Sequence, residues 1–177
     1  VFYRRFEGGV ENDDARSLDR LIDDLVATGS VDPSRIHVVG WSNGAFFGQE
    51  YALFRKRSPT PGGHRIASVV AFDGADPFAS PTAASTGCAL LDLPQVPLPV
   101  FLVHRACSTV ACDAAQWSQL GLDPGYDVGT WRTRLENEIG ATVQELIVRS
   151  NGSAGPCQQL CTMTQALIQH VRWPDGI

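Results

Sequence analysis

The stretch that decides the fold of this chain is residues 36–47, IHVVGWSNGAFF. A short run rich in β-branched residues ends in Gly-x-Ser-x-Gly, with Ser42 at its centre, and a run able to form a helix follows. This order is typical of a nucleophile elbow, a sharp, strained turn that lifts a serine hydroxyl clear of a sheet. The helix after the turn directs the positive end of its dipole at the serine. The pattern predicts Ser42 as a nucleophile and the backbone N–H of Asn43 as an oxyanion donor; the alternative is a glycine-rich turn without chemistry.

Apolar runs predict the strands of the fold. Strands are expected at residues 36–39, 66–72, 100–104 and 142–148. The first of them is apolar apart from His37, which is the pattern of a strand buried on both faces. His37 itself is therefore expected to pack in the core.

Helices are expected between these strands and before the first of them. The first is predicted to follow a cap at Asp13 or Asp14 and to stop at residues 28–30. The others are predicted from after Ser42 to about residue 56, at 114–120 and at 130–139. The first helix carries apolar residues at helical spacing on one face: Leu18, Leu21, Ile22, Leu25 and Val26. Strands alternating with helices predict an α/β fold, a mainly parallel sheet with flanking helices, as one domain of residues 1–177.

The composition narrows the classes of partner. The chain has 177 residues, of which 44% are hydrophobic and 19% charged, as in a globular protein. Its 19 acidic and 14 basic side chains leave a net charge of −5, which argues against a nucleic-acid partner. No apolar run reaches the ~20 residues that a membrane-spanning helix needs. We expect neither nucleic-acid binding nor a membrane span.

The cysteines allow two interpretations. Four of the five form two close pairs, Cys107 with Cys112 and Cys157 with Cys161, while Cys88 stands apart. The spacings lack the Cys-x2-Cys and histidine pattern of metal sites, so no metal is expected. The pairs are either two local disulfides, which imply an oxidising compartment, or four ordinary thiols of a cytosolic protein.

A serine nucleophile needs a general base and a carboxylate that orients the base. In chains with this elbow the order is Ser, then Asp or Glu, then His. His170 satisfies that order and is the candidate base, with a surface histidine as the alternative. His64 lies in a loop rich in Pro and Gly, and His104 ends the third strand before any candidate acid.

The orienting acid is expected about four residues after the third strand. Ser108 stands there, and Asp113 is the nearest carboxylate. Asp113 is either the acid, brought into place by a Cys107–Cys112 disulfide, or the N-cap of the helix at 114–120. The other candidates are Asp73, Asp76, Asp127 and Glu136.

Three segments carry a resemblance to a known family. They are VDPSRI at 31–36 leading into GWSNG at 40–44, PVFLVH at 99–104, and HVRWPDG at 170–176. Together they resemble the polyhydroxybutyrate depolymerase and feruloyl esterase (LpqC-like) branch of the α/β-hydrolases. The resemblance implies Ser42 as nucleophile, His170 as base, and hydrolysis of acyl or aryl esters or polyesters through an acyl-enzyme. It also implies a secreted protein without a cofactor, whose partner is a small-molecule or polymeric ester.

The chain departs from that family at three points. Arg105 replaces the glycine after the strand histidine, Ser108 stands in the acid position, and the early oxyanion loop of the family has no counterpart here. We expect the chain to correspond to the carboxyl-terminal part of such a hydrolase, either as a fragment or as a reduced domain. The alternative function is a catalytically impaired hydrolase or a binding module on the same scaffold. Apolar residues near the elbow could line an acyl pocket or belong to the core: Trp41, Phe46, Phe47 and Phe78.

Overall fold

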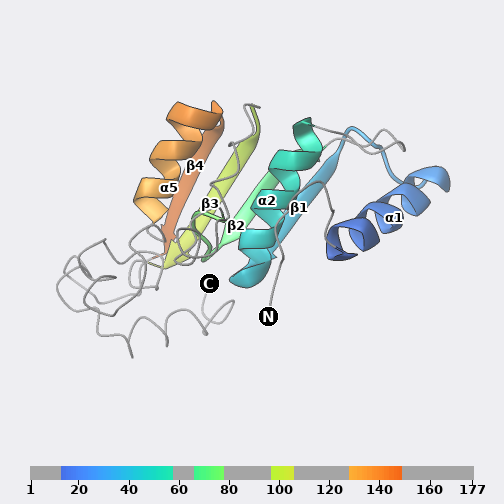
Figure 1. The fold of residues 1–177 in the computed structure, drawn as a ribbon, viewed down its shortest axis with the longest axis horizontal. Helices are drawn as coiled ribbons and strands as arrows, with labels where there is room; N and C mark the ends of the chain where they lie inside the picture. Colours follow the sequence, from blue (N-terminus) through green and yellow to red (C-terminus); the bar gives the residue numbers. More distant parts are fainter. Residues whose placement is uncertain (1–12, 58–65, 78–96, 106–127, 149–177) are drawn as a thin grey trace, which may run out of the picture.

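The computed structural model describes residues 13–57, 66–77, 97–105 and 128–148 (Figure 1). In chain order the elements are α1 (Asp13–Ala27), β1 (Ile36–Trp41), α2 (Asn43–Arg57), β2 (Ile66–Phe72), β3 (Pro99–Arg105), α5 (Val128–Arg134), the π-helical segment η3 (Leu135–Ile139) and β4 (Thr142–Val148). All the strands expected from the sequence are confirmed, with one or two extra residues at the ends of β1 and β3. The helix expected at 114–120 lies outside the described residues.

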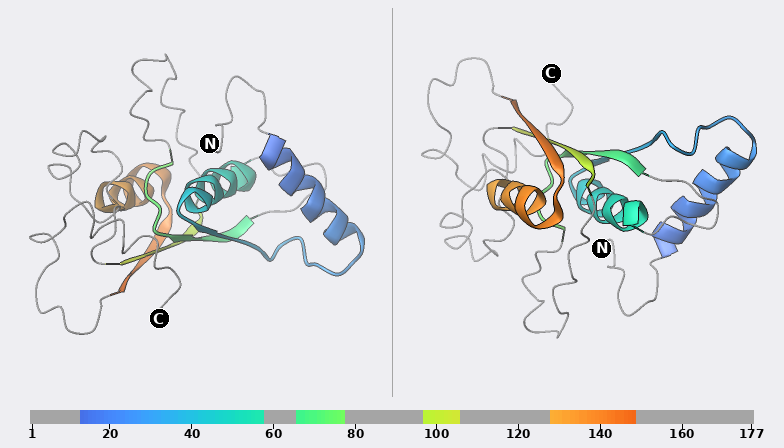
Figure 2. Two further views of the ribbon diagram at one scale, coloured as in Figure 1. Left: turned by 90° about the horizontal axis from the view of Figure 1, so that it is seen from below. Right: turned by 90° about the horizontal axis from the view of Figure 1, so that it is seen from above.

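The four strands form a parallel sheet in the order β1-β2-β3-β4, so their carboxyl ends meet at one edge. Helices α2 and α5 lie side by side on the same face of this sheet, whereas α1 lies beyond β1, as two opposite views show (Figure 2). The predicted α/β fold with a parallel sheet is therefore confirmed. In the part of the chain that the structure describes, no helix is both long and apolar enough to cross a bilayer.

The core fills the space between α2, α5 and the sheet face that they cover. Its largest fully buried apolar side chains are Trp131, Tyr51, Leu53, Ile66, Leu98, Leu102, Leu135 and Ile139. Alternate residues of each strand point into this layer, because successive side chains of a strand face opposite sides. The core thus fixes which residues of each strand face the helices.

Strand β1 corrects one prediction from the sequence. It alternates between half-buried and exposed residues and is not buried on both faces. Val39 is 65% exposed and Trp41 is 46% exposed. His37 is also exposed, and its Nδ1 lies 2.8 Å from the Ser68 hydroxyl on β2, so the expectation of a core histidine is wrong. The reason is that α2 covers only one face of β1, which a run of apolar letters does not show.

The apolar face expected on α1 is confirmed in part. Ile22 is buried, and Leu18 and Val26 pack against the core. Leu21 and Leu25, in contrast, are 56% and 44% exposed. The stripe of α1 that packs against the core is therefore narrower than the spacing of its apolar residues predicts.

A buried polar cluster fastens α1 to α2. The Asp19 carboxylate of α1 accepts hydrogen bonds from the Tyr51 hydroxyl at 2.8 Å and from Arg55 Nε at 2.9 Å. A second Arg55 nitrogen donates to the other carboxylate oxygen, which makes the ion pair bidentate. Burial and the adjacent Asp19 carboxylate raise the pKa of Tyr51, so its hydroxyl stays a donor.

We predict that Asp19→Ala lowers the free energy of unfolding by about 3–5 kcal/mol, because it removes the carboxylate that pairs with Arg55 in the interior. Asp24→Ala, at an exposed position of the same helix, should change stability by less than about 0.5 kcal/mol. Urea unfolding followed by circular dichroism measures both variants. Equal losses in the two variants would show that the cluster does not hold α1 in place.

Candidate active site

Ser42 occupies the turn between β1 and α2 with a backbone φ of +53°. Residues other than glycine rarely adopt this left-handed region. Two sets of hydrogen bonds fix it. The Ser42 N–H donates to the Phe72 carbonyl at 2.9 Å, which extends the β1–β2 ladder by one residue, and its carbonyl accepts from Ala45 N–H at 2.9 Å and Phe46 N–H at 3.2 Å. The same residue therefore ends the strand and starts the helix, and the strained turn expected from the sequence is present.

The two glycines of the motif have different roles. A Cβ atom at Gly40 would lie 2.1 Å from the carbonyl oxygen of Gly44, so only glycine fits there. A Cβ atom at Gly44 would meet nothing within 4 Å. Close approach of the last strand residues to the first turn of α2 therefore depends on Gly40.

A second strained residue follows the next strand. Asp73 has a φ of +54° and is fully buried, and its N–H donates to the Val103 carbonyl of β3 at 2.7 Å. In the sheet, Trp41 pairs with Phe72, Phe72 with Val103, and Val103 with Leu146. The next residues of the four strands, which are Ser42, Asp73, His104 and Ile147, therefore form one row at the carboxyl edge.

Two of the alternative acids have other partners in the structure. Asp76, which is almost fully buried, pairs with Arg134 of α5. Glu136 pairs with Arg132 one helical turn away, at 3.2 Å. These contacts assign both carboxylates to the packing of α5 and η3. Asp73 is the candidate that the register places next to the elbow.

Gln49, which the sequence analysis did not single out, joins three elements. Its side-chain amide donates to the carbonyl of Ala45 at 3.1 Å and to the carbonyl of Ala75 at 3.0 Å, and its oxygen accepts from the indole N–H of Trp131 at 2.7 Å. Gln49 is buried. The first turn of α2, the turn after β2 and helix α5 are thereby held together around the elbow. The signal in the sequence that could have identified Gln49 is a polar residue on the helix face that covers the sheet.

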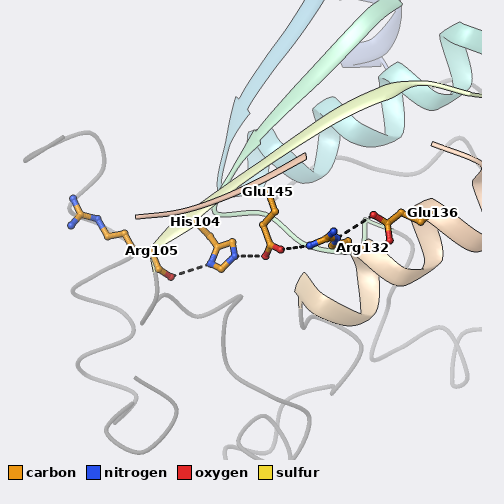
Figure 3. Close-up of polar contacts among 5 residues, drawn as sticks. All are labelled: His104, Arg105, Arg132, Glu136 and Glu145. Atoms are coloured by element: carbon orange, nitrogen blue, oxygen red, sulfur yellow. Dashed lines mark hydrogen bonds and ion pairs between the residues drawn. The ribbon is translucent and has the colours of Figure 1, made fainter. Parts of the chain in front are cut away.

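A chain of polar contacts begins at His104, at the carboxyl edge of the sheet, and runs through Glu145 and Arg132 to Glu136 (Figure 3). His104 Nε2 lies 2.8 Å from Glu145 Oε1 of β4, and the other Glu145 oxygen accepts from Arg132 of α5 at 2.8 Å. His104 is buried, and its Nδ1 lies 3.1 Å from the Arg105 carbonyl oxygen. Burial alone would raise the pKa of Glu145, but the hydrogen bonds from His104 and Arg132 outweigh it and hold the pKa below its ordinary value. The sequence placed His104 at the end of the third strand but predicted neither of its partners.

Of the predicted nucleophile, oxyanion donor, base and first-choice acid, the structure describes Ser42 and Asn43. Asn43 is the first residue of α2, where a backbone N–H has no partner within the helix. Phe46 and Phe47 pack against the core, whereas Trp41 is half exposed. Outside the described residues lie His170, Asp113, Asp127, Ser108, Phe78, Cys107, Cys112, Cys157 and Cys161. Among the described residues, no cluster of three or more His, Cys, Asp or Glu side chains could hold a metal ion.

The sheet and the elbow define the class of fold. Consecutive parallel strands, with helices packed on the sheet and a strained serine between a strand and the helix that follows it, form an α/β-hydrolase-type fold. The described residues form part of such a fold.

Among the solved structures that are similar to this chain are the two that follow. The crystal structure of esterase PE8 is 21% identical with a TM-score of 0.46, over 87% of this chain and 60% of that one. The crystal structure of a single-substitution variant of Arabidopsis thaliana SOBER1 is 13% identical with a TM-score of 0.48, over 88% of this chain and 62% of that one. The chain thus spans about three fifths of the length of these proteins. It matches no protein-family model and no curated protein sequence.

We predict that Gly40→Ala lowers the free energy of unfolding by about 3 kcal/mol or more, because the new methyl group overlaps backbone atoms that cannot move aside. Gly44→Ala, which adds the same methyl group in open space, should stay within about 1 kcal/mol of the unmodified protein. Chemical unfolding compares the pair directly. A tolerated Gly40→Ala would contradict the close approach described above.

We predict that Glu145 stabilises the fold only while it is ionised. Its pKa is lower in the folded state than in the unfolded chain, so its stabilisation is complete above the unfolded pKa and is lost as the pH falls through the folded pKa. The difference in unfolding free energy between the unmodified protein and Glu145→Gln should therefore shrink from about pH 6 to about pH 3. Urea titrations at a series of pH values test this, and a difference independent of pH would refute it.

Proposed function

We propose that the chain is the catalytic part of a serine ester hydrolase that acts through an acyl-enzyme on Ser42. The observation that carries the proposal is the left-handed conformation of Ser42 at the carboxyl edge of a parallel sheet. A left-handed residue other than glycine costs about 1–3 kcal/mol, and such residues cluster at active sites and ligand clamps. This geometry supports a nucleophile at this position.

The proposed reaction assigns one role to each predicted residue. His170 accepts the proton of the Ser42 hydroxyl as the oxygen attacks the ester carbonyl, and Asp113 orients His170. The Asn43 N–H donates to the oxyanion that forms. The alcohol leaves with the proton from His170, and water then hydrolyses the acyl-enzyme by the same steps in reverse. Since both nitrogens of His104 are engaged, its contacts favour another histidine as the base.

The substrate class follows from the sequence resemblance. The motifs around Ser42 and His170 favour the polyhydroxybutyrate depolymerase and feruloyl esterase branch, and hence acyl or aryl esters or polyesters. We propose a secreted enzyme without a cofactor, with the disulfides Cys107–Cys112 and Cys157–Cys161. Mass spectrometry of the non-reduced protein tests these pairings.

A second candidate function is a binding module that uses the same scaffold without turnover. Ser108 in the position expected for the acid favours it, since a triad without its orienting acid loses most of its rate.

We predict that a fluorophosphonate probe labels Ser42, and that Ser42→Ala abolishes labelling and lowers hydrolysis of a short p-nitrophenyl ester by about 10³-fold or more. Ser17→Ala, on the exposed surface of α1, serves as the control and should keep both activities. Turnover that survives Ser42→Ala would exclude the acyl-enzyme mechanism. A folded protein that neither labels nor hydrolyses would support the binding module.

A further inference from the structure

The contacts of His104 determine how many protons its ring carries. Nε2 faces the Glu145 carboxylate at 2.8 Å, and Nδ1 faces the backbone carbonyl of Arg105 at 3.1 Å. A carbonyl oxygen and an ionised carboxylate are acceptors only. A neutral imidazole has one N–H, so either tautomer would direct a nitrogen lone pair at an oxygen. Two ring protons satisfy both contacts.

The surroundings of Glu145 support the same assignment. Its second oxygen accepts from the Arg132 guanidinium at 2.8 Å, so donors face both oxygens of the carboxylate. Arg132 in turn pairs with Glu136. Charges therefore alternate along the chain of contacts, from a histidine side chain that is 5% exposed to Arg132 and Glu136 at 42% and 38%. Charge balance matters most at His104, the buried end of this series of contacts, because burying an unpaired charge is costly.

The position of His104 links this charge to the edge that carries Ser42. His104 lies in the same row as Ser42, two strands away, or about 10 Å at the usual strand spacing. Arg105, whose carbonyl His104 contacts, is the last residue of β3. The segment with Ser108 and Asp113 follows Arg105 directly in the sequence. A buried hydrogen bond to this carbonyl fixes the backbone at the point where the chain leaves the sheet.

We propose that His104 is a buried imidazolium and a positioning residue, which holds the carboxyl end of β3 through the Arg105 carbonyl while Glu145 and Arg132 balance its charge. The positioning role rests on the proposed ester hydrolase function, whereas the charge of His104 does not. Other charged groups at this end of the strand are Arg105 itself and Asp73, which follows β2 and bonds to the backbone of Val103.

Nitrogen-15 NMR of the histidine rings tests the charge. Near neutral pH, both nitrogens of His104 should show shifts of the protonated type, assigned by comparison with His104→Gln. In Glu145→Gln, which keeps the shape of the side chain, His104 should change to a neutral ring. Glu138→Gln is the matched control, because Glu138 pairs with Arg134 and not with this chain of contacts. The ring of His37 serves as the internal comparison for these shifts. Its partner is the Ser68 hydroxyl, which can donate or accept and so does not require a proton on the contacting nitrogen. A neutral His104 ring in the unmodified protein would overturn the proposal.

The labelling rate of Ser42 by a fluorophosphonate tests the positioning role. His104→Phe, which removes the hydrogen bond to the Arg105 carbonyl, should slow labelling roughly tenfold or more, while Glu138→Gln should label at the rate of the unmodified protein. Circular dichroism confirms that both variants are folded. Unchanged labelling in a folded His104→Phe would overturn the positioning role. If the unmodified protein does not label at all, the proposed function and the positioning role both fail, and NMR alone decides the charge of His104.

Discussion

The close approach of Gly40 to the carbonyl group of Gly44 is the constraint on which the rest of this structure depends. A side chain of any size at residue 40 would overlap the first turn of α2. Because that space is available, β1 passes into α2 through Ser42 without an intervening loop, and Ser42 adopts its left-handed conformation. The position of α2 on the sheet, and with it the cover of the core, follows from this approach.

Buried polar groups complete the packing that the elbow begins. Helix α2 contributes to two clusters: Tyr51 and Arg55 bind Asp19 of α1, and Gln49 binds Trp131 of α5 and the turn after β2. Each buried polar group in these clusters has a partner, so its desolvation is compensated. Polar contacts of this kind depend on direction, and apolar packing does not. They therefore fix the relative positions of helices that the apolar core alone would hold less specifically.

The elements that the sequence predicts well are those with local signals. The elbow, β2 and β4 lie where glycine placement and apolar runs indicated them. The exposure of His37 depends on which face a helix covers, and this is a tertiary property. The distant partners of Gln49 and His104 lie 26, 82 and 41 residues away in the sequence. No local pattern contains such pairings, because the register between strands and the placement of helices create them.

That register also explains why chemistry can gather at this edge. Strands β1 and β2 both turn away from the sheet one residue after the pair Trp41–Phe72, each through a left-handed residue, whereas β3 and β4 continue by two residues. The unequal lengths place Ser42 and Asp73, which end their strands, level with His104, which lies within its own. A residue at a strand end lies in a turn, while a residue within β3 has a neighbouring strand on each side. The edge thus combines a serine in a strained backbone conformation with a histidine that is held by a carboxylate and a carbonyl. Because both ring nitrogens of His104 are engaged, the geometry favours positioning over proton transfer as its role.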